Sequence, residues 1–268
     1  MKTYKEEITL ITNSRGCDII DTVKGCPAGA LYDGRGCYGD CYAKNIADRY
    51  GFDFLKVRLR KFQQDEVQLM LVGFKDRDHA NQIVKGIRES SMPFVRIGEM
   101  GDPSLAWEHT LEVCSEIADA GKPIMIITKH WKPIPDALLT QVEKLNLCVN
   151  TSASALDTSE EVEYRVAQFE RLKSVCKSVL RIVSCDFNTD NHEGLERHRV
   201  QEELFKRSPH LDTVFRPSND NPFLTRGVIR AKRVKFLRVE TLASVRNQST
   251  YFGMCPTCPD MCGVVEAQ

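Results

Sequence analysis

Short β-type runs alternate with helical patterns along most of the chain. The β-type runs are 7–13 (EITLITN), 93–100 (PFVRIGEM), 123–130 (PIMIITKH), 147–154 (LCVNTSAS), 179–187 (VLRIVSCDF) and 211–217 (LDTVFRP). The helical patterns are 42–87 with breaks near Gly51 and Gly73, 105–120, 135–145, 159–177 and 192–207. Connections of this length favour parallel strands covered by helices. The alternation therefore predicts an α/β fold, a partial (β/α)6 parallel barrel with a cysteine-containing C-terminal extension.

No internal repeat or low-complexity linker divides the chain, which favours one continuous domain. We expect a barrel core over 1–219 and a C-terminal extension over 220–268. The longest apolar runs, LMLV and IMII, are far too short to cross a bilayer. The N-terminus, MKTYKEEITL, carries acidic residues where a signal peptide would need an apolar segment. We therefore expect a cytoplasmic protein with no membrane partner.

The formal net charge is zero, so no whole-protein field attracts nucleic acid. One local stretch differs, because seven basic residues and a single acid, Glu240, lie between Arg226 and Arg246. Such a stretch suits phosphate groups of a nucleic acid or nucleotide. A solvated basic face explains it equally well.

The chain has 11 cysteines, an odd count that fits a disulfide framework poorly in a reducing compartment. Three of the scattered ones, Cys114, Cys148 and Cys176, sit among apolar neighbours and read as core residues. Six of the other cysteines form two clusters of three, one near each end of the chain. Metal binding or catalysis is therefore the better interpretation of the clusters.

The first cluster lies in the stretch CPAGALYDGRGCYGDCYA, which contains Cys26, Cys37 and Cys41. Thiolates bind zinc or iron-sulfur clusters, and three of them leave a fourth coordination position open. A structural zinc site normally has four protein ligands, often as two close pairs, which this spacing does not resemble. The glycines of the stretch let the backbone fold tightly around a bound group.

A loop of three cysteines after the first strand of a partial α/β barrel, with an aromatic residue beside the last cysteine, resembles the radical S-adenosylmethionine (SAM) superfamily. The stretch GCYGDCYA resembles the cysteine loops of a phage and bacterial branch that is related to the spore photoproduct lyases. The spacing here, C-x10-C-x3-C, differs from the commonest C-x3-C-x2-C of the superfamily. The resemblance covers about residues 7–219.

The resemblance implies that Cys26, Cys37 and Cys41 hold a [4Fe-4S] cluster to which SAM binds. It also implies that Gly98-Glu99 in RIGEMGDPS binds the amino group of SAM, a sensible partner because charge-assisted hydrogen bonds are strong. Other polar residues at strand ends are candidates for contacts to SAM: Asn150, Ser152, Arg181 and Ser184.

The chemistry implied by the resemblance is reductive cleavage of SAM to methionine and a 5′-deoxyadenosyl radical that abstracts a substrate hydrogen. A reductase, flavodoxin or ferredoxin would donate the electron. Lys129 and His130 end a strand in ITKHW and are the catalytic candidates, either by contacting substrate or by relaying a proton. A structural role for each remains open.

The second cluster, FGMCPTCPDMCG, contains Cys255, Cys258 and Cys262. We expect these thiolates to hold an auxiliary cluster or a zinc ion, with a fourth ligand from Cys17, from another residue or from the substrate. A zinc site that only pins the tail is the structural interpretation.

The substrate class is open at this level. Isomerisation or modification of a nucleic-acid base or nucleotide, such as a modified pyrimidine in phage DNA, is one hypothesis, and a peptide or small metabolite is another. A different class altogether is a zinc-stabilised nucleic-acid-binding protein in which both cysteine clusters are structural.

Overall fold

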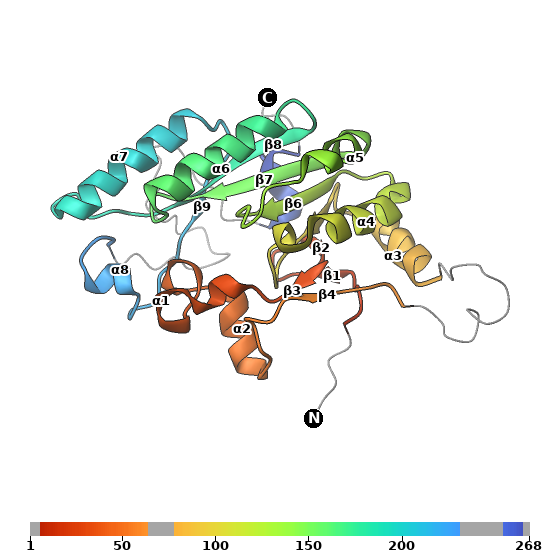
Figure 1. Ribbon diagram of the computed structural model, residues 1–268, viewed down its shortest axis with the longest axis horizontal. Coiled ribbons are helices and arrows are strands. Elements are labelled where there is room, and N and C mark those ends of the chain that lie inside the picture. The colour runs from red at the N-terminus through yellow and green to blue at the C-terminus, as the bar shows by residue number, and fades with distance from the viewer. Residues whose placement is uncertain (1–5, 64–77, 231–253, 265–268) are drawn as a thin grey trace.

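The computed structural model describes residues 6–63, 78–230 and 254–264. Its centre is a seven-stranded sheet in the order β1-β2-β5-β6-β7-β8-β9, curled into a half-barrel (Figure 1). Strand β1 is antiparallel to β2, and each later neighbour pair is parallel. The strands are β1 Ile11–Thr12, β2 Asp18–Ile20, β5 Val95–Ile97, β6 Ile124–Thr128, β7 Leu147–Ala153, β8 Lys177–Ser184 and β9 Thr213–Val214. A separate antiparallel pair joins β3 Val23–Lys24 and β4 Arg58–Leu59.

Helices connect the parallel strands, and one short helix follows the last of them. They are α2 Tyr42–Tyr50, α3 Asp78–Glu89, α4 Trp107–Ile117, α5 Leu139–Lys144, α6 Ser159–Leu172 and α7 His192–Lys206, with short α1 Leu31–Gly34 and α8 Pro222–Thr225. Short 3-10 turns are Pro27–Ala30, Cys37–Gly39, Pro103–Ala106, Ala118–Ala120, Asp136–Leu138, Cys255–Thr257 and Met261–Gly263. Figure 1 shows α6 and α7 above the sheet and α1 and α2 below it. None of the described helices is long and apolar enough to cross a bilayer.

The two faces of the sheet carry different residues, because successive side chains of a strand point to opposite faces. On β6, Ile124 and Ile126 belong to the core under the helices. Met125, between them, packs with Cys17 and the C-terminal segment on the other, inner face. The inner face is therefore covered by loops and by the two ends of the described chain.

Helix α6 shows how local sequence sets the element boundaries. The Thr158 hydroxyl accepts from the amide of Glu161, and the Glu161 carboxylate accepts from the amide of Thr158, which forms a capping box. Phe169 and Leu172 are buried against the sheet side of the helix. The helix therefore begins at the residue after Thr158.

The structure confirms the sequence-based strands at 93–100, 123–130, 147–154, 179–187 and 211–217, in shortened form. The expected strand at 7–13 is wrong in part, because only the antiparallel edge β1 lies there. The first parallel strand is β2, after a turn in which the Gly16 amide donates to the Asn13 carbonyl oxygen. The helix expected to run to Lys177 ends at Leu172, because Lys177 already begins β8.

Candidate functional site

The candidate site lies where β2 and β5 end. Ile20 of β2 pairs with Ile97 of β5, so the segments after the two strands begin side by side. The amides of Glu99 and Met100 donate to Asp21 Oδ1 over 2.6 and 2.9 Å. Burial raises the pKa of Asp21, although these two donors oppose the shift. Asp21 thus ties the Gly-Glu segment to the strand that leads into the cysteine loop.

Gly98 and Glu99 have the features expected of a ligand-binding turn. Gly98 has φ +94°, and a Cβ there would lie 2.8 Å from Pro103 Cγ, so a larger residue does not fit. Burial raises the pKa of the Glu99 carboxyl, Arg96 opposes the shift and Asp21 adds to it. A cationic group beside Glu99 would favour the ionised form. Arg96 already supplies one positive charge near this carboxylate, and Glu99 remains a candidate acceptor for an ammonium group.

The cysteine loop is anchored at its start to these neighbouring segments. The Gly25 amide donates to the Met100 carbonyl oxygen over 2.9 Å, and the Cys26 amide donates to the Phe54 carbonyl oxygen over 2.7 Å. The loop then passes repeatedly through left-handed backbone conformations, at Tyr32, Asp33, Gly34, Gly36, Tyr38 and Gly39. This winding brings Cys41 against the hydrophobic cluster that contains Cys26, whereas Cys37 packs in the neighbouring cluster that contains Tyr38.

Gly36 allows the closest approach within the loop. A Cβ on Gly36 would lie 2.4 Å from the Cys41 Cβ and 3.4 Å from its Sγ, and Gly36 has φ +74°. Gly34 has a similar φ of +80°, but a Cβ there would meet nothing within 4 Å. Glycine is therefore needed at 36 for space as well as for conformation.

The loop brings the three thiols of Cys26, Cys37 and Cys41 within electrostatic reach of one another. Burial raises the pKa of Cys26 to about 12, and a charge on either of the other two would raise it further. Burial raises the pKa of Cys37 to about 11, whereas the charge of Lys129 lowers it. Within 6–63, 78–230 and 254–264, no three Cys, His, Asp or Glu side chains converge in metal-binding geometry. The donor set itself, soft sulfur on a glycine-rich turn, suits an iron-sulfur cluster or zinc.

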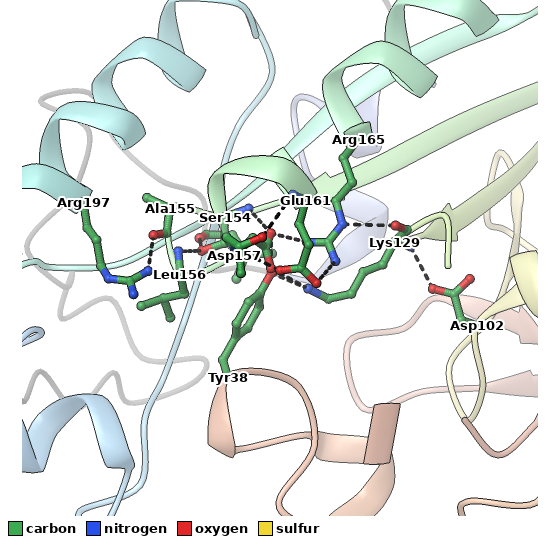
Figure 2. Close-up of polar contacts among 12 residues, drawn as sticks. Tyr38, Asp102, Lys129, Ser154, Ala155, Leu156, Asp157, Glu161, Arg165 and Arg197 are labelled. Atoms are coloured by element: carbon green, nitrogen blue, oxygen red, sulfur yellow. Dashed lines mark hydrogen bonds and ion pairs between the residues drawn. The ribbon is translucent and has the colours of Figure 1, made fainter. Parts of the chain in front are cut away.

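A buried polar network packs beside the loop, as Figure 2 shows. The Tyr38 hydroxyl donates to Asp157 Oδ2 over 3.1 Å, and the Lys129 ammonium donates to the Tyr38 oxygen. Lys129 Nζ lies 3.8 Å from the centre of the Tyr38 ring and 3.6 Å from Asp157 Oδ1. Arg165 forms an ion pair with Asp157. Burial would raise the pKa of Asp157, but Lys129 and Arg165 outweigh it and the pKa is lowered.

The two catalytic candidates from the third parallel strand have different surroundings. Lys129 lies beside Cys37 and Tyr38, at the cysteine loop. His130 is fully buried, has φ +51°, contacts the Thr151 hydroxyl over 3.0 Å and packs against the Trp107 ring. This placement favours a structural role for His130 and keeps Lys129 as the candidate for function.

The other polar residues chosen from strand ends do not gather at the cysteine loop. The Asn150 amide donates to the Cys262 carbonyl oxygen over 3.1 Å, and Arg181 Nη1 donates to the Cys262 Sγ over 2.9 Å. Ser184 donates to the Asp212 carboxylate, and Ser152 is buried within β7. Asn150 and Arg181 therefore face the C-terminal segment, and their assignment to SAM stays a prediction.

Cys255, Cys258 and Cys262 lie on the inner face of the sheet, in the cavity that Cys17 also lines. The Cys17 thiol lies within hydrogen-bonding reach of Cys255 and of the Asp18 carbonyl oxygen, 3.7 Å away. The contact with Cys17 lowers the pKa of Cys255 to about 6, burial opposes the shift, and Arg15 reinforces it. The two cysteine clusters are thus at opposite ends of β2, since Cys17 precedes that strand and Cys26 follows it.

The sequence alone missed the Tyr38, Asp157 and Arg165 network and the position of Asp21. One signal was available for Tyr38, which stands between two of the loop cysteines. Another was available for Asp21, a carboxylate directly after a short apolar strand. Asp102 caps the 3-10 turn Pro103–Ala106, because its Oδ1 accepts from the Ser104 amide over 2.9 Å.

Most of the basic stretch 226–246 lies outside the described residues. Arg226 and Arg230 are within them and lie 3.6 Å from Glu193 and 3.7 Å from Asp190 respectively. The prediction of a nucleic-acid contact there stays a prediction.

The chain was compared with known proteins at three levels. No family model, no curated protein and no solved structure matches it. The functional argument therefore depends on the residues and geometry described above.

Proposed function

We propose that the protein is a radical SAM enzyme built on a partial (β/α)6 barrel, with Cys26, Cys37 and Cys41 as the ligands of a [4Fe-4S] cluster. One observation carries the proposal. The three-cysteine loop and Gly98-Glu99 follow two paired parallel strands, and Asp21 joins them through the backbone of Glu99. Ligand sites of parallel α/β sheets form at such carboxyl ends.

When bound, the cluster would supply one electron for cleavage of SAM to methionine and a 5′-deoxyadenosyl radical. The chain would supply binding and orientation. The Glu99 carboxylate would accept hydrogen bonds from the SAM ammonium group, because its half-buried setting favours a cationic partner. Gly98 would keep the backbone in the turn that presents Glu99, since no side chain fits there.

Lys129 would contribute a fixed positive charge beside the loop. Its ammonium group lowers the pKa of Cys37 and is held in place by Tyr38 and Asp157. Asp157 is fixed in turn by Arg165 and by the Ser154 amide over 2.8 Å. Lys129 and Arg165 would oppose the burial that raises the pKa of Cys37, and the packed side chains would exclude water from one side of the loop.

The nature of the substrate and of the electron donor is a further part of the proposal. A nucleic-acid base or nucleotide suits the basic stretch 226–246, of which only the first residues are described. A reductase, flavodoxin or ferredoxin would supply the electron. The argument that this site cleaves SAM depends neither on the substrate nor on the electron donor.

The test is the iron, sulfide and zinc content of anaerobically purified protein, wild type beside the Cys26/Cys37/Cys41 triple alanine variant. The proposal requires the variant to lose about four irons and the matching sulfide. Zinc without iron in reconstituted wild type would contradict it and would favour the zinc-stabilised binding protein instead.

A further inference from the structure

The C-terminal segment 254–264 is built into the inner face of the half-barrel. The Asn150 amide and the Arg181 guanidinium both contact Cys262, from β7 and β8 respectively. Lys177 donates to the Val264 carbonyl oxygen over 3.0 Å, and His210 Nδ1 lies 2.9 Å from Asp260 Oδ1. These contacts fix the segment at the amino-terminal part of the parallel sheet.

Cys17 is presented to this segment by a tight turn. The side chain of Asn13 accepts from the amides of Arg15 and Cys17 over 2.9 and 3.1 Å. The Arg15 carbonyl oxygen then accepts from the Cys255 amide over 2.7 Å. A Cβ on Gly16 would lie 3.2 Å from Met254 and 3.3 Å from Pro256, so the turn and the segment are in direct contact.

Four thiols therefore line one cavity, and the charged side chains around them are mainly cationic. The cysteines are Cys17, Cys255, Cys258 and Cys262, and the charged residues in the lining are Arg15, Arg96, Arg181, Arg216, Asp212 and Asp260. A metal bound by four thiolates carries net negative charge, whether the metal is Zn²⁺ or a [4Fe-4S] cluster. The excess of guanidinium groups complements that charge.

We infer that Cys17, Cys255, Cys258 and Cys262, whose thiols line one cavity without converging on one point in this structure, close around a metal as a tetrathiolate centre on the inner face of the half-barrel. Zinc and an iron-sulfur cluster share this ligand chemistry, and the experiment below distinguishes them. With four protein ligands the centre is closed, so it joins the two ends of the described chain and leaves no position for SAM. The inference is independent of the proposed function.

Cys148 is the nearest competitor for the fourth position, because it also lies beside Cys262. Its Sγ points to the Cys262 carbonyl oxygen, 3.9 Å away, and accepts from the Asn150 amide over 3.5 Å. Cys17 instead lines the cavity together with Cys255, Cys258 and Cys262, whereas Cys148 is not part of that lining. Cys148 is therefore a matched control: a second buried thiol next to the segment that we do not expect to bind metal.

The experiment measures zinc, iron and sulfide in Cys17→Ala, Cys148→Ala, the Cys255/Cys258/Cys262 triple alanine variant and wild type. We expect Cys17→Ala and the C-terminal triple variant to lose the same metal, one zinc or about four irons. Cys148→Ala should keep it. A Cys17→Ala protein with wild-type metal content, or a C-terminal triple variant with no loss, would overturn the inference.

Two further arms keep the result interpretable. The Cys26/Cys37/Cys41 triple alanine variant should retain the C-terminal metal, so failure of the first cluster and failure of this centre are separable. If Cys17→Ala does not fold, the Cys26/Cys37/Cys41 triple alanine variant is loaded with zinc instead. X-ray absorption at the zinc edge then counts the ligands of the C-terminal metal. Four sulfur scatterers support the inference, and three sulfurs with one nitrogen or oxygen contradict it.

Discussion

The Asp21 carboxylate accepts a hydrogen bond from the Glu99 amide over 2.6 Å and so joins the end of β2 to the end of β5. Asp21 is buried, and it leads into the strand pair before the cysteine loop. The backbone from which the Glu99 side chain extends is therefore held in place beside the loop. This relationship makes the Glu99 carboxylate a direct test of the SAM site.

Replacing Glu99 with glutamine should weaken SAM binding by about 10- to 100-fold, because a hydrogen bond between charged groups contributes about 1.5–3 kcal/mol. The iron content should be unchanged, since Glu99 is not a proposed ligand of the cluster. Anaerobic equilibrium dialysis with SAM gives the dissociation constant. Glu108→Gln, an exposed change in the first turn of α4, is the control. Equal affinity in Glu99→Gln and wild type would remove Glu99 from the site.

Replacing Gly36 with alanine should reduce cluster retention, because the new Cβ would lie 2.4 Å from the Cys41 Cβ. Gly34→Ala also places a Cβ on a residue with positive φ, at a backbone cost of about 1 kcal/mol, but that Cβ meets nothing within 4 Å. Iron per protein after anaerobic gel filtration compares the two variants. We expect a clear loss for Gly36→Ala and near-wild-type iron for Gly34→Ala. Similar iron in both would show that the Gly36–Cys41 contact does not shape the cluster site.

Replacing Arg165 with methionine should destabilise the protein by about 3 kcal/mol, because it leaves Asp157 buried with less compensation. Arg165 is 2% exposed and forms an ion pair with Asp157. Urea unfolding measures the change in free energy. The control is Arg199→Met, whose exposed pair with Glu196 should contribute less than about 1 kcal/mol. A loss for Arg165→Met no larger than for the control would mean that the network is not a stabilising unit.

The buried His130 should make stability depend on pH. Burial lowers its pKa from 6.5 to about 4; Asp102 opposes the shift, whereas Arg165 and Arg171 reinforce it. Because the pKa of His130 is lower in the folded state, the stability that the neutral side chain contributes is complete above pH 6.5 and is lost as the pH falls toward 4. The difference between these two pKa values corresponds to about 3 kcal/mol in the free energy of unfolding.

The comparison uses His130→Asn, because asparagine tolerates the left-handed backbone at this position better than most residues. Urea unfolding at pH 7.5 and pH 4.5 should show a smaller loss of stability on acidification in His130→Asn than in wild type. An identical loss in both proteins would assign the acid sensitivity to other groups.

The α/β architecture could be predicted from the sequence, because its strands are apolar runs separated by amphipathic helices. Both patterns depend only on residues that are close together in the chain. It placed the later parallel strands correctly but missed β2, whose three residues are too short to stand out beside the longer run 7–13. The Asn13–Cys17 turn that separates β1 from β2 shows its role only through its side-chain and backbone hydrogen bonds.

The polar network at the loop could not be read from the sequence, because its members come from distant segments. Tyr38, Lys129 and Asp157 meet only when the loop, β6 and the start of α6 are folded together. The contacts of Asn150 and Arg181 with Cys262 could not be read from the sequence either. Both point to the inner face, as a ligand contact requires, but the C-terminal segment occupies that position.

The most direct measurement is 5′-deoxyadenosine formation by reconstituted, reduced protein incubated with SAM, wild type beside Cys37→Ala. We expect product from wild type and none above background from Cys37→Ala, while the metal of the C-terminal cysteines remains bound in both. Wild-type levels of product from Cys37→Ala, or no product from a wild-type protein that carries its full iron and sulfide, would contradict the proposed radical SAM site.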